Sequence, residues 1–318
     1  MPTLFGCARA DKATTPASSA GSATQTSPGP SIVIGTMVTE DILPMWVAES
    51  EGMLANSGLD VSIQTFQSAQ ELSTALASGA IEMAMTDIMV SATLEASGTP
   101  VALRWVTLGT TPEQGRFGIM ASPASGYTTL EQLAGVPIGV GSCTVPEYVM
   151  DKLMAAAGVS KDEIIGEEIK KVPVRYEMMV ANQVAAAALP GSLLALGEVN
   201  GMILIADDRG AENLSQSVMI ANADFSQSSE GAAALSLLGG IWNEAVRMIN
   251  DDPEAFRGLL IEKAQLPEPV QATYPVNKYP LTELPSAAMV DPVLDWMFEK
   301  GYLSQELRYD PQTGTFSH

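Results

Sequence analysis

The sequence has almost no histidine, and this excludes several kinds of chemistry. Of the 318 residues only the last, His318, is a histidine. A Ser-His-Asp or Cys-His nucleophile system, a histidine-ligated zinc and a histidine general base therefore lack their central residue. The phosphate-loop pattern Gly-x-x-x-x-Gly-Lys and the dinucleotide pattern Gly-x-Gly-x-x-Gly are also absent. We expect no cofactor and no bound metal, although carboxylates or lysine could still act in catalysis.

Cysteine, positive charge and long apolar runs are also scarce. The two cysteines, Cys7 and Cys143, are too few for a disulfide framework. The 16 basic and 37 acidic side chains give a net charge of −21, which argues against nucleic acid or an anionic lipid surface as a partner. No apolar run approaches the length that spans a bilayer. The chain is nevertheless long enough for two domains with their own cores.

The N-terminal stretch differs in composition from the rest. Cys7 closes the tetrapeptide Leu4-Phe5-Gly6-Cys7, which resembles the bacterial lipobox around an acylated cysteine, although Phe5 departs from its usual pattern. Residues 13–30 are rich in Ser, Thr, Ala, Pro and Gly, and such a composition is typical of a flexible tether. This layout predicts an exported protein that reaches the membrane only through a lipid anchor on Cys7. A stray cysteine in a mobile N-terminus is the alternative.

Two segments about a hundred residues apart repeat one pattern. Residues 75–98 and 178–201 align without a gap. Each reads as the end of a helix, a residue suited to left-handed backbone (Gly79 or Asn182), a short apolar strand, a sharp turn and a second helix. Two copies of one α/β unit predict two similar lobes that face each other.

Strands and helices alternate from Ser31 to about residue 221, whereas residues 230–318 read as mostly helical. This alternation predicts parallel sheets with crossover helices. With the repeat, it predicts an α/β protein of two lobes, each a mostly parallel sheet flanked by helices, joined by hinge strands near 117–121 and 218–221. A helix over 42–55 and a strand over 171–174 are among the expected elements. The expected parts are a lipobox-like start and tether (1–30), a first lobe (31–121 plus 218–318) and a second lobe (122–217).

Several motifs, in their order, resemble a known family. The segment VAESEGMLANSGLDVSIQTFQSAQELSTALASGAIEMAMTDI resembles the N-terminal lobe of solute-binding proteins of ABC importers, in the branch that includes sulfonate, taurine, nitrate and thiamine-precursor binders. The segment TTLEQLAGVPIGVGSCTVPEYVMDKLMAAAGV is similar to the start of their second lobe. The resemblance covers about residues 31–310. It implies a periplasmic-binding-protein fold of type II in a monomer outside the cytoplasm, either lipid-anchored or periplasmic. Such a protein captures a small molecule and delivers it to a membrane permease.

The resemblance also includes enzymes of the pyrimidine-precursor and menaquinone-pathway type. The pyrimidine synthases use a histidine and a cysteine-rich motif, whereas here Cys143 stands alone and is better explained as a small packed residue. We therefore predict a binding protein and not an enzyme. A sensory or adhesive lipoprotein with this fold is a further alternative.

Ligand-binding residues are expected in four strand-to-helix turns, because ligands of open α/β sheets bind at the carboxyl ends of strands. Helix N-termini at these turns present free N–H groups and the positive end of the helix dipole. The candidates are Thr36, Thr39 and Trp46; Thr86, Asp87 and Ser91; Ser142, Cys143, Thr144 and Tyr148; and Pro190 and Ser192.

Most of these candidates also fit a structural role. Asp87 is expected first as a helix N-cap, although its carboxylate could also accept N–H or O–H donors from a ligand. Ser142 and Thr144 fit caps as well. Trp46 and Tyr148 are more typical of a helix core than of a cleft.

No arginine or lysine stands at the four turns, so a bidentate anion clamp is not favoured. Arg116 and Arg175 are nearest in sequence, and Arg175 is expected to begin a helix away from the cleft. Together with Asp87, this pattern favours a neutral or nitrogen-bearing heteroaromatic ligand, such as a thiamine precursor. A sulfonate is the alternative.

Overall fold

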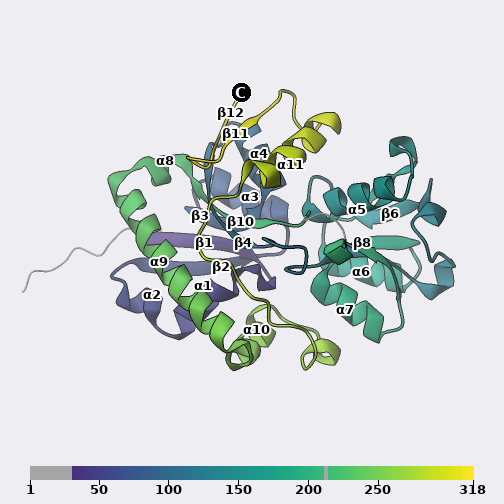
Figure 1. Cartoon of the computed structure of the whole chain (residues 1–318), viewed down its shortest axis with the longest axis horizontal. Helices are drawn as coiled ribbons and strands as arrows, with labels where there is room; N and C mark the ends of the chain where they lie inside the picture. The colour runs from purple at the N-terminus through teal and green to yellow at the C-terminus, as the bar shows by residue number, and fades with distance from the viewer. Residues whose placement is uncertain (1–30, 211–213) are drawn as a thin grey trace, which may run out of the picture.

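A computed structural model of the chain describes residues 31–210 and 214–318. These residues form two α/β lobes that lie side by side (Figure 1). The expected tether and the lipobox-like Cys7 lie outside the described residues. In the described part of the chain, no helix combines the length and the apolar character needed to cross a membrane.

The first lobe is built on a sheet of seven strands in the order β11-β12-β4-β10-β3-β1-β2. Its strands are β1 (Ser31–Met37), β2 (Asp60–Phe66), β3 (Met83–Asp87), β4 (Val101–Leu108), β10 (Ser217–Asn222), β11 (Arg308–Asp310) and β12 (Thr315–Ser317). Strand β1 pairs in parallel with β2 and β3, and β10 runs antiparallel to both β3 and β4.

The second lobe is built on a sheet of five strands in the order β7-β6-β8-β5-β9. Its strands are β5 (Phe117–Ala121), β6 (Pro137–Val140), β7 (Ile165–Glu168), β8 (Ala186–Pro190) and β9 (Ile203–Asp207). Strand β6 is parallel to β7 and β8, whereas β5 is antiparallel to β8 and β9. Each sheet therefore joins three parallel strands to antiparallel strands that link the lobes.

The helices flank both sheets (Figure 1). The first lobe carries α1 (Leu43–Ser50), α2 (Met53–Asn56), α3 (Ala69–Ala77), α4 (Ile88–Ala96), α8 (Ala223–Gln227), α9 (Ser229–Asp251), α10 (Arg257–Lys263) and α11 (Ala287–Glu299). The second lobe carries α5 (Val145–Ala156), α6 (Val172–Val180) and α7 (Gly191–Val199). Short 3-10 helices are η1 (Glu40–Ile42), η2 (Pro123–Ser125), η3 (Glu131–Leu133), η4 (Lys161–Glu163), η5 (Asp208–Gly210), η6 (Pro253–Phe256) and η7 (Glu268–Val270).

The repeat recognised in the sequence is the same structural unit in both lobes. In the gap-free alignment, β3 and α4 fall on β8 and α7 residue by residue. Gly79 and Asn182 both have the expected positive φ, of 72° and 52°. The two-lobed α/β architecture expected from the sequence is thus confirmed.

The chain crosses from the larger sheet to the smaller one after β4, and it crosses back after β9. Strand β5 lies in the second sheet, whereas the boundary expected at residue 121 would place it in the first lobe. The crossing precedes β5, because the strand finds its hydrogen-bond partners in β8 and β9.

Three expected elements differ in the structure. The segment 171–174, expected as a strand, begins α6, and Pro173 suits the first turn of a helix. The helix expected over 42–55 is interrupted at Gly52, whose φ of 73° ends α1 before α2 begins. The C-terminal part is not helical throughout, because β11 and β12 form a hairpin at the edge of the larger sheet.

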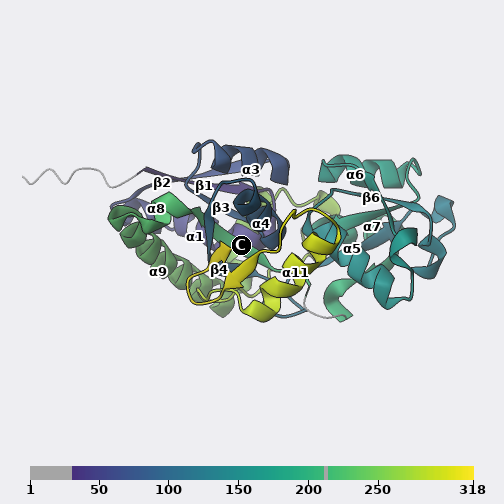
Figure 2. The ribbon, with the colours of Figure 1, turned by 90° about the horizontal axis from the view of Figure 1, so that it is seen from above.

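Buried apolar side chains form two clusters around the larger sheet and two around the smaller one. One of them continues from one lobe into the other, because Tyr148 and Val149 of α5 share a cluster with Trp296 of α11. The Tyr148 and Trp296 rings meet edge to face with centroids 5.2 Å apart. Figure 2 shows α11 beside α5, and α3 and α6 along the opposite side of the molecule.

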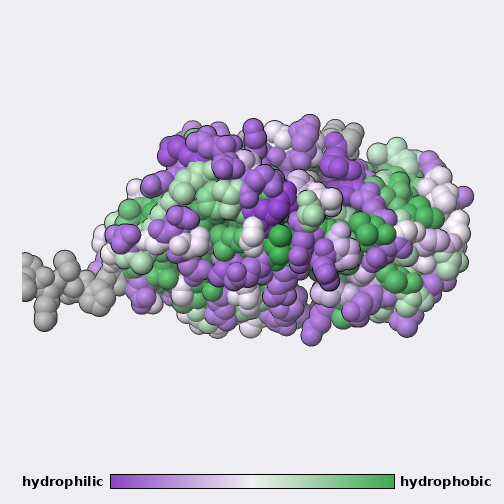
Figure 3. All heavy atoms as spheres, turned by 90° about the horizontal axis from the view of Figure 1, so that it is seen from below, coloured by the Kyte–Doolittle hydropathy of each residue, from purple (hydrophilic) through white to green (hydrophobic). Residues whose placement is uncertain are grey.

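Hydrophilic and apolar side chains are interspersed on the face shown in Figure 3. Large apolar side chains that are exposed, such as Val199 and Leu281, are spread over several parts of the chain. Scattered apolar groups of this kind are normal for a protein surface.

Candidate ligand-binding site

A cavity of about 260 Å³ lies between the lobes, at the carboxyl ends of strands from both sheets. The turns after β1, β2 and β3 line it from the first lobe, and the starts of α5, α6 and α7 line it from the second. Its apolar wall includes Met37, Phe66, Met85, Phe117 and Leu193. This is where the expected cleft was placed.

The candidate residues divide evenly between the cavity wall and other positions. Those in the wall are Thr39, Thr86, Asp87, Thr144, Pro190 and Ser192. Those outside it are Thr36, Trp46, Ser91, Ser142, Cys143 and Tyr148. A role in ligand binding stays a prediction for the first group.

Packing explains why most of the second group misses the cavity. Thr36 is fully buried, and its hydroxyl donates to the carbonyl oxygen of Met37 at 2.9 Å. Ser91 is also buried and donates to the carbonyl oxygen of Asp87 at 2.7 Å. Trp46 lies in the core of the first lobe, and Tyr148 packs on α11.

Ser142 and Cys143 are held by carboxylates of the second lobe. The Ser142 amide donates to Glu168 Oε2 at 2.9 Å, and the Ser142 hydroxyl donates to the same oxygen. The Cys143 amide donates to Glu147 Oε2 at 2.6 Å. Burial raises the pKa of the Cys143 thiol to about 11, so that the thiolate needed for nucleophilic attack is scarce at neutral pH.

Asp87 connects the two lobes. Its Oδ1 accepts the Val90 amide of α4 at 2.7 Å, so the expected N-cap is present. It also accepts a backbone hydrogen bond from Val145, the first residue of α5 in the other lobe. Burial raises the pKa of Asp87 to about 6, because desolvation outweighs these hydrogen bonds. The carboxyl group thus serves two helices and also faces the cavity.

Glu40 in the cavity wall was not recognised from the sequence. The Tyr274 hydroxyl donates to Glu40 Oε1, and the Tyr279 hydroxyl donates to the Glu40 carbonyl oxygen at 2.7 Å. Burial, and then the charge of Asp41, raise the pKa of Glu40 to about 7.

Asp41, the neighbour of Glu40, was missed as well. Its Oδ1 accepts the Ser217 hydroxyl at 2.6 Å, and Ser217 in turn accepts the Thr107 hydroxyl at 2.9 Å. Both acids follow the first expected turn directly. In a sequence, however, two acids at a helix start are typical of charges that interact with the helix dipole, so the pattern gave no specific signal.

Arg175 lines the cavity, so the expectation that it begins a helix away from the cleft was wrong. Its Nε and Nη2 donate to the Ile169 carbonyl oxygen at 3.0 and 2.9 Å, and its Nη1 donates to that of Ala188 at 2.8 Å. Because β7 ends at Glu168, the start of α6 lies at the carboxyl edge of the sheet. Burial lowers the pKa of Arg175 to about 10.

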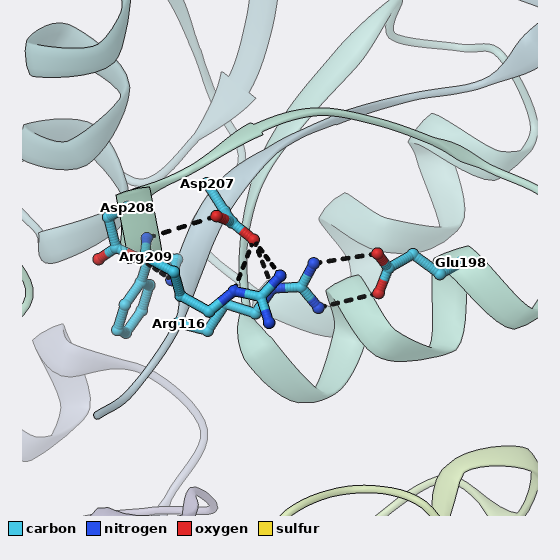
Figure 4. A network of polar contacts seen from close by, with 6 residues as sticks. Arg116, Glu198, Asp207, Asp208 and Arg209 are labelled. Carbon is cyan, nitrogen blue, oxygen red and sulfur yellow. Dashed lines mark hydrogen bonds and ion pairs between the residues drawn. The ribbon is translucent and has the colours of Figure 1, made fainter. Parts of the chain in front are cut away.

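Arg116 also lines the cavity, but carboxylates of its own lobe surround it (Figure 4). Its Nη1 and Nη2 bond to Glu198 at 2.8 and 3.0 Å, and its Nε bonds to Asp207 Oδ2 at 2.8 Å. Arg209 bonds to the same oxygen of Asp207. The hydrogen bond from Arg116 lowers the pKa of Glu198. This guanidinium is therefore already neutralised in the bidentate geometry that an anion would use.

Two further contacts join the lobes, and the first lies at the mouth of the cavity, where Lys170 lines the wall and is exposed. Lys170, before α6, donates to Gln70 Oε1 of α3 at 2.8 Å. Tyr274 of the first lobe approaches α7 so closely that a Cβ on Gly191 would lie 2.7 Å from its hydroxyl. Among the described residues, no group of three His, Cys, Asp or Glu side chains is arranged to hold a metal ion. The arrangement is that of two walls closed around a small chamber.

A family model described as NMT1/THI5 like matches residues 39–236, well over half of the 318 residues. No curated protein is similar enough in sequence to match the chain.

Solved structures resemble the chain over most of its length. The periplasmic aliphatic sulphonate binding protein SsuA from Escherichia coli has a TM-score of 0.71 at 18% identity, covering 87% of this chain and 89% of its own. A conserved Candida albicans gene product with the generic periplasmic binding protein fold has a TM-score of 0.65 at 14% identity, covering 87% and 92%. The periplasmic nitrate-binding protein NrtA from Synechocystis PCC 6803 has a TM-score of 0.61 at 14% identity, covering 75% and 68%. These likenesses establish the periplasmic-binding-protein fold.

Proposed function

Since the chain belongs to the NMT1/THI5-like family, we propose that it is the solute-binding component of an ABC importer. It captures a small molecule between its lobes, outside the cytoplasm, and delivers the molecule to a membrane permease. The shared fold with a sulphonate-binding and a nitrate-binding protein supports this role.

The observation that carries the proposal is the chamber between the lobes. Its wall combines apolar side chains with a few polar groups, as is usual for small-molecule sites. Residues of both lobes contribute to it, so a bound molecule would hold the lobes together. The ligand would be a nitrogen-bearing heteroaromatic molecule or a sulfonate.

Further parts of the proposal concern the whole chain. The protein acts as a monomer, and the two lobes built on its two sheets move toward each other when the ligand binds.

A lipid on Cys7 holds it at the outer side of the cell membrane. Mass spectrometry of the protein from a bacterial membrane fraction tests the anchor: a diacylglycerol adduct on Cys7, lost in Cys7→Ala, is expected, and unmodified Cys7 in the soluble fraction would contradict it.

An enzymatic role on the same fold has less support. The Cys143 thiol has a raised pKa and lies outside the cavity wall, and His318 is exposed at the C-terminus. Among the described residues, the cavity wall therefore offers neither a cysteine thiol nor an imidazole for the chemistry of the pyrimidine synthases.

A thermal-shift screen of the full chain tests the binding role. The panel contains thiamine precursors, flavins, purines, taurine, alkyl sulfonates, nitrate and aromatic acids. A ligand at a hundred times its Kd stabilises the folded protein by about 2.7 kcal/mol, which a melting curve readily detects. Small-angle scattering should show a smaller radius of gyration with the same ligand.

Two matched variants connect a hit to the cavity. Ala69→Trp adds an indole at the cavity wall, and Ala96→Trp makes the same change at an exposed position outside it. We expect the first variant to lose the ligand-induced shift and the second to keep it. A flat panel with no compaction would contradict the proposed function.

A further inference from the structure

The charged groups of the cavity differ in whether they already have a partner of opposite charge. The first lobe contributes three carboxyl groups to the wall, those of Glu40, Asp41 and Asp87. Within the described part of the chain, none of the three makes an ion pair. Carboxylates removed from water without a positive partner are costly, so this wall favours a cation.

Of the basic groups of the wall, Arg116 alone has acidic partners, and Lys170 and Arg175 donate to neutral oxygens. Arg116 is paired with Glu198 and Asp207. Lys170 is bonded to Gln70 at the cavity mouth, and each nitrogen of Arg175 donates to a backbone carbonyl oxygen. To bind an anionic ligand, Arg116 would have to release its carboxylates, whereas a cationic ligand at the carboxyl groups would break no ion pair.

Asp41 is the best placed of the three carboxyl groups to hold such a cation. Glu40 is buried and accepts the Tyr274 hydroxyl, whereas Asp87 is partly buried and accepts backbone hydrogen bonds from two helix starts. Asp41 is also partly buried, but it holds no helix start, and its Oδ1 is fixed by the chain of hydroxyl groups from Ser217 and Thr107. Its Oδ2 accepts no hydrogen bond from any described residue. A fixed carboxylate with one free oxygen at the cavity wall is a ready acceptor.

The surroundings of Asp41 suit an organic cation with an apolar part. Phe66 and Phe117 contribute aromatic rings to the wall, and Met37 and Met85 contribute thioethers. The buried Thr39 hydroxyl also lines the cavity, and its Oγ1 has no hydrogen-bond partner among the described residues. It adds one polar contact for a ligand that carries further N–H or O–H groups.

We propose that Asp41 anchors a positively charged nitrogen of the ligand, which is an organic cation such as a protonated amine, an amidine or a protonated nitrogen heterocycle. This inference rests on the proposed function and makes positive charge the property that defines its ligand, so that sulfonates are excluded and amines and amidines are added. It separates this chain from the sulphonate- and nitrate-binding proteins whose fold it shares. Ser217 also lines the cavity, and it acts as a positioning residue because its hydroxyl donates to Asp41 Oδ1 and orients the carboxylate.

Isothermal titration calorimetry with matched probes tests the charge of the ligand. Two sets of probes are used at pH 7.5: benzylamine, benzyl alcohol and benzenesulfonate, and propylamine, propanol and propanesulfonate. We expect the amine of at least one set to bind at least tenfold more tightly than its alcohol and its sulfonate. Asp41→Asn should weaken binding of that amine by about 10- to 100-fold, because it removes a charged hydrogen bond.

Asp60→Asn is the matched control. Asp60 is exposed at the start of β2, at the sheet edge opposite the cavity, so the same loss of charge should leave amine binding unchanged. If Asp41→Asn fails to fold, Ser217→Ala provides the second test. This variant retains the Asp41 carboxylate but removes the hydrogen bond that orients it. We therefore expect the affinity for the amine alone to fall by about 3- to 10-fold.

The outcomes separate this inference from the proposed function. Tighter binding of a sulfonate than of its amine, or unchanged amine affinity in folded Asp41→Asn, would overturn the inference and leave the binding role intact. The same holds if the broad thermal-shift panel gives a hit while neither probe set binds. No binding in either the panel or the probe sets would overturn both.

Discussion

At the scale of single residues, the carboxyl groups of the cavity combine structural and functional duties. Asp87 caps α4, reaches the start of α5 and lines the cavity, and Glu40 accepts the Tyr274 hydroxyl. Both have a raised pKa because burial disfavours their charged forms. The effect of a substitution on stability can therefore be distinguished from its effect on ligand binding only with a control variant. The control must remove the same structural interaction at a position outside the cavity.

Asp87→Ala should lower both stability and ligand affinity. The lost cap costs about 1–2 kcal/mol of unfolding free energy, measured by chemical denaturation. Ser228→Ala removes the cap of α9, where Ser228 Oγ accepts the Gly231 amide at 2.9 Å, outside the cavity wall. We expect the control to lose stability but not affinity. If Asp87→Ala behaves like the control, Asp87 is only a cap.

Glu40→Gln should change how stability depends on pH. The pKa of Glu40 is raised from 4.5 to about 7 in the folded protein, so the folded state binds the proton more tightly. This stabilisation is complete below about pH 4.5 and is lost as the pH rises through about 7. Between pH 5 and 8 the wild-type unfolding free energy should therefore fall by about 1–3 kcal/mol more than that of the variant.

Denaturant titrations at the two pH values measure this difference. Glu51→Gln, at an exposed position, should follow the wild type. Asp87 also makes the unfolding free energy fall as the pH rises, because its pKa is raised too. This contribution is the same in all the proteins compared. Equal slopes for the wild type and Glu40→Gln would show that the Glu40 carboxyl does not couple to folding.

At the scale of elements, the crossings between the lobes depend on a close backbone approach. Gly109 follows β4 with a φ of 87°, and a Cβ there would lie 2.5 Å from the Ser215 carbonyl oxygen of the other crossing. A side chain would therefore be strained twice, by its backbone conformation and by the clash.

Gly109→Ala should be much more destabilising than Gly98→Ala. Gly98 has a similar φ of 84°, but a Cβ there would meet no atom within 4 Å. The control should cost about 1 kcal/mol for the left-handed conformation alone. We expect Gly109→Ala to cost at least about 2 kcal/mol more, since the neighbour is backbone and cannot move aside. Equal melting temperatures for the two variants would contradict the close approach.

The elements also show what could be predicted from the sequence. The unit of β3 and α4, and its copy of β8 and α7, was recognised because Gly79 and Asn182 end helices in a conformation that few residues adopt. Strand β7 was missed because all four of its residues are exposed, so that it lacks an apolar alternation. The expected strand was then placed on the start of α6, and Arg175 was assigned away from the cleft.

Residues of the cavity wall were predictable at several turns that follow a strand, although Ser142 and Cys143 lie in such a turn and outside the wall. Residues that tertiary packing brings to the wall were not predictable. Thr39, Thr86 and Asp87 lie in such turns and line the cavity. The partners that fix Asp41 and Glu40 are Ser217 and Tyr274, at sequence separations of 176 and 234 residues. No local sequence pattern indicates a contact between residues that are so far apart in the chain.

At the scale of the whole molecule, the two sides of the lobe interface are built differently. On one side Tyr148 packs against Trp296 and Lys300 bonds to Asp151 at 2.9 Å, joining α5 to α11. On the other side, Lys170 and Gln70 meet through one hydrogen bond at the cavity mouth. The apolar side resists separation, so the mouth is the side expected to open.

Paired spin labels at residues 70 and 170 should report this opening. Their distance should be longer and more broadly distributed without ligand, and shorter once the thermal-shift ligand is added. Labels at residues 161 and 299 form the control pair, because Lys161 and Glu299 are bonded between the second lobe and α11. Their distance should not change. Equal changes in both pairs, measured by double electron–electron resonance with Cys7 and Cys143 replaced by serine, would contradict a one-sided motion.

The position of β10 has a consequence for the order in which the protein acquires structure during synthesis. This strand lies between β4 and β3 in the larger sheet, yet it follows the entire smaller sheet along the chain. A ribosome therefore releases β1 to β4 with a gap in their sheet, while the strands of the smaller sheet emerge as an uninterrupted segment. Contacts between distant segments form late. The middle of the chain should thus become structured before its beginning, and the first lobe should mature only after β10 has left the ribosome.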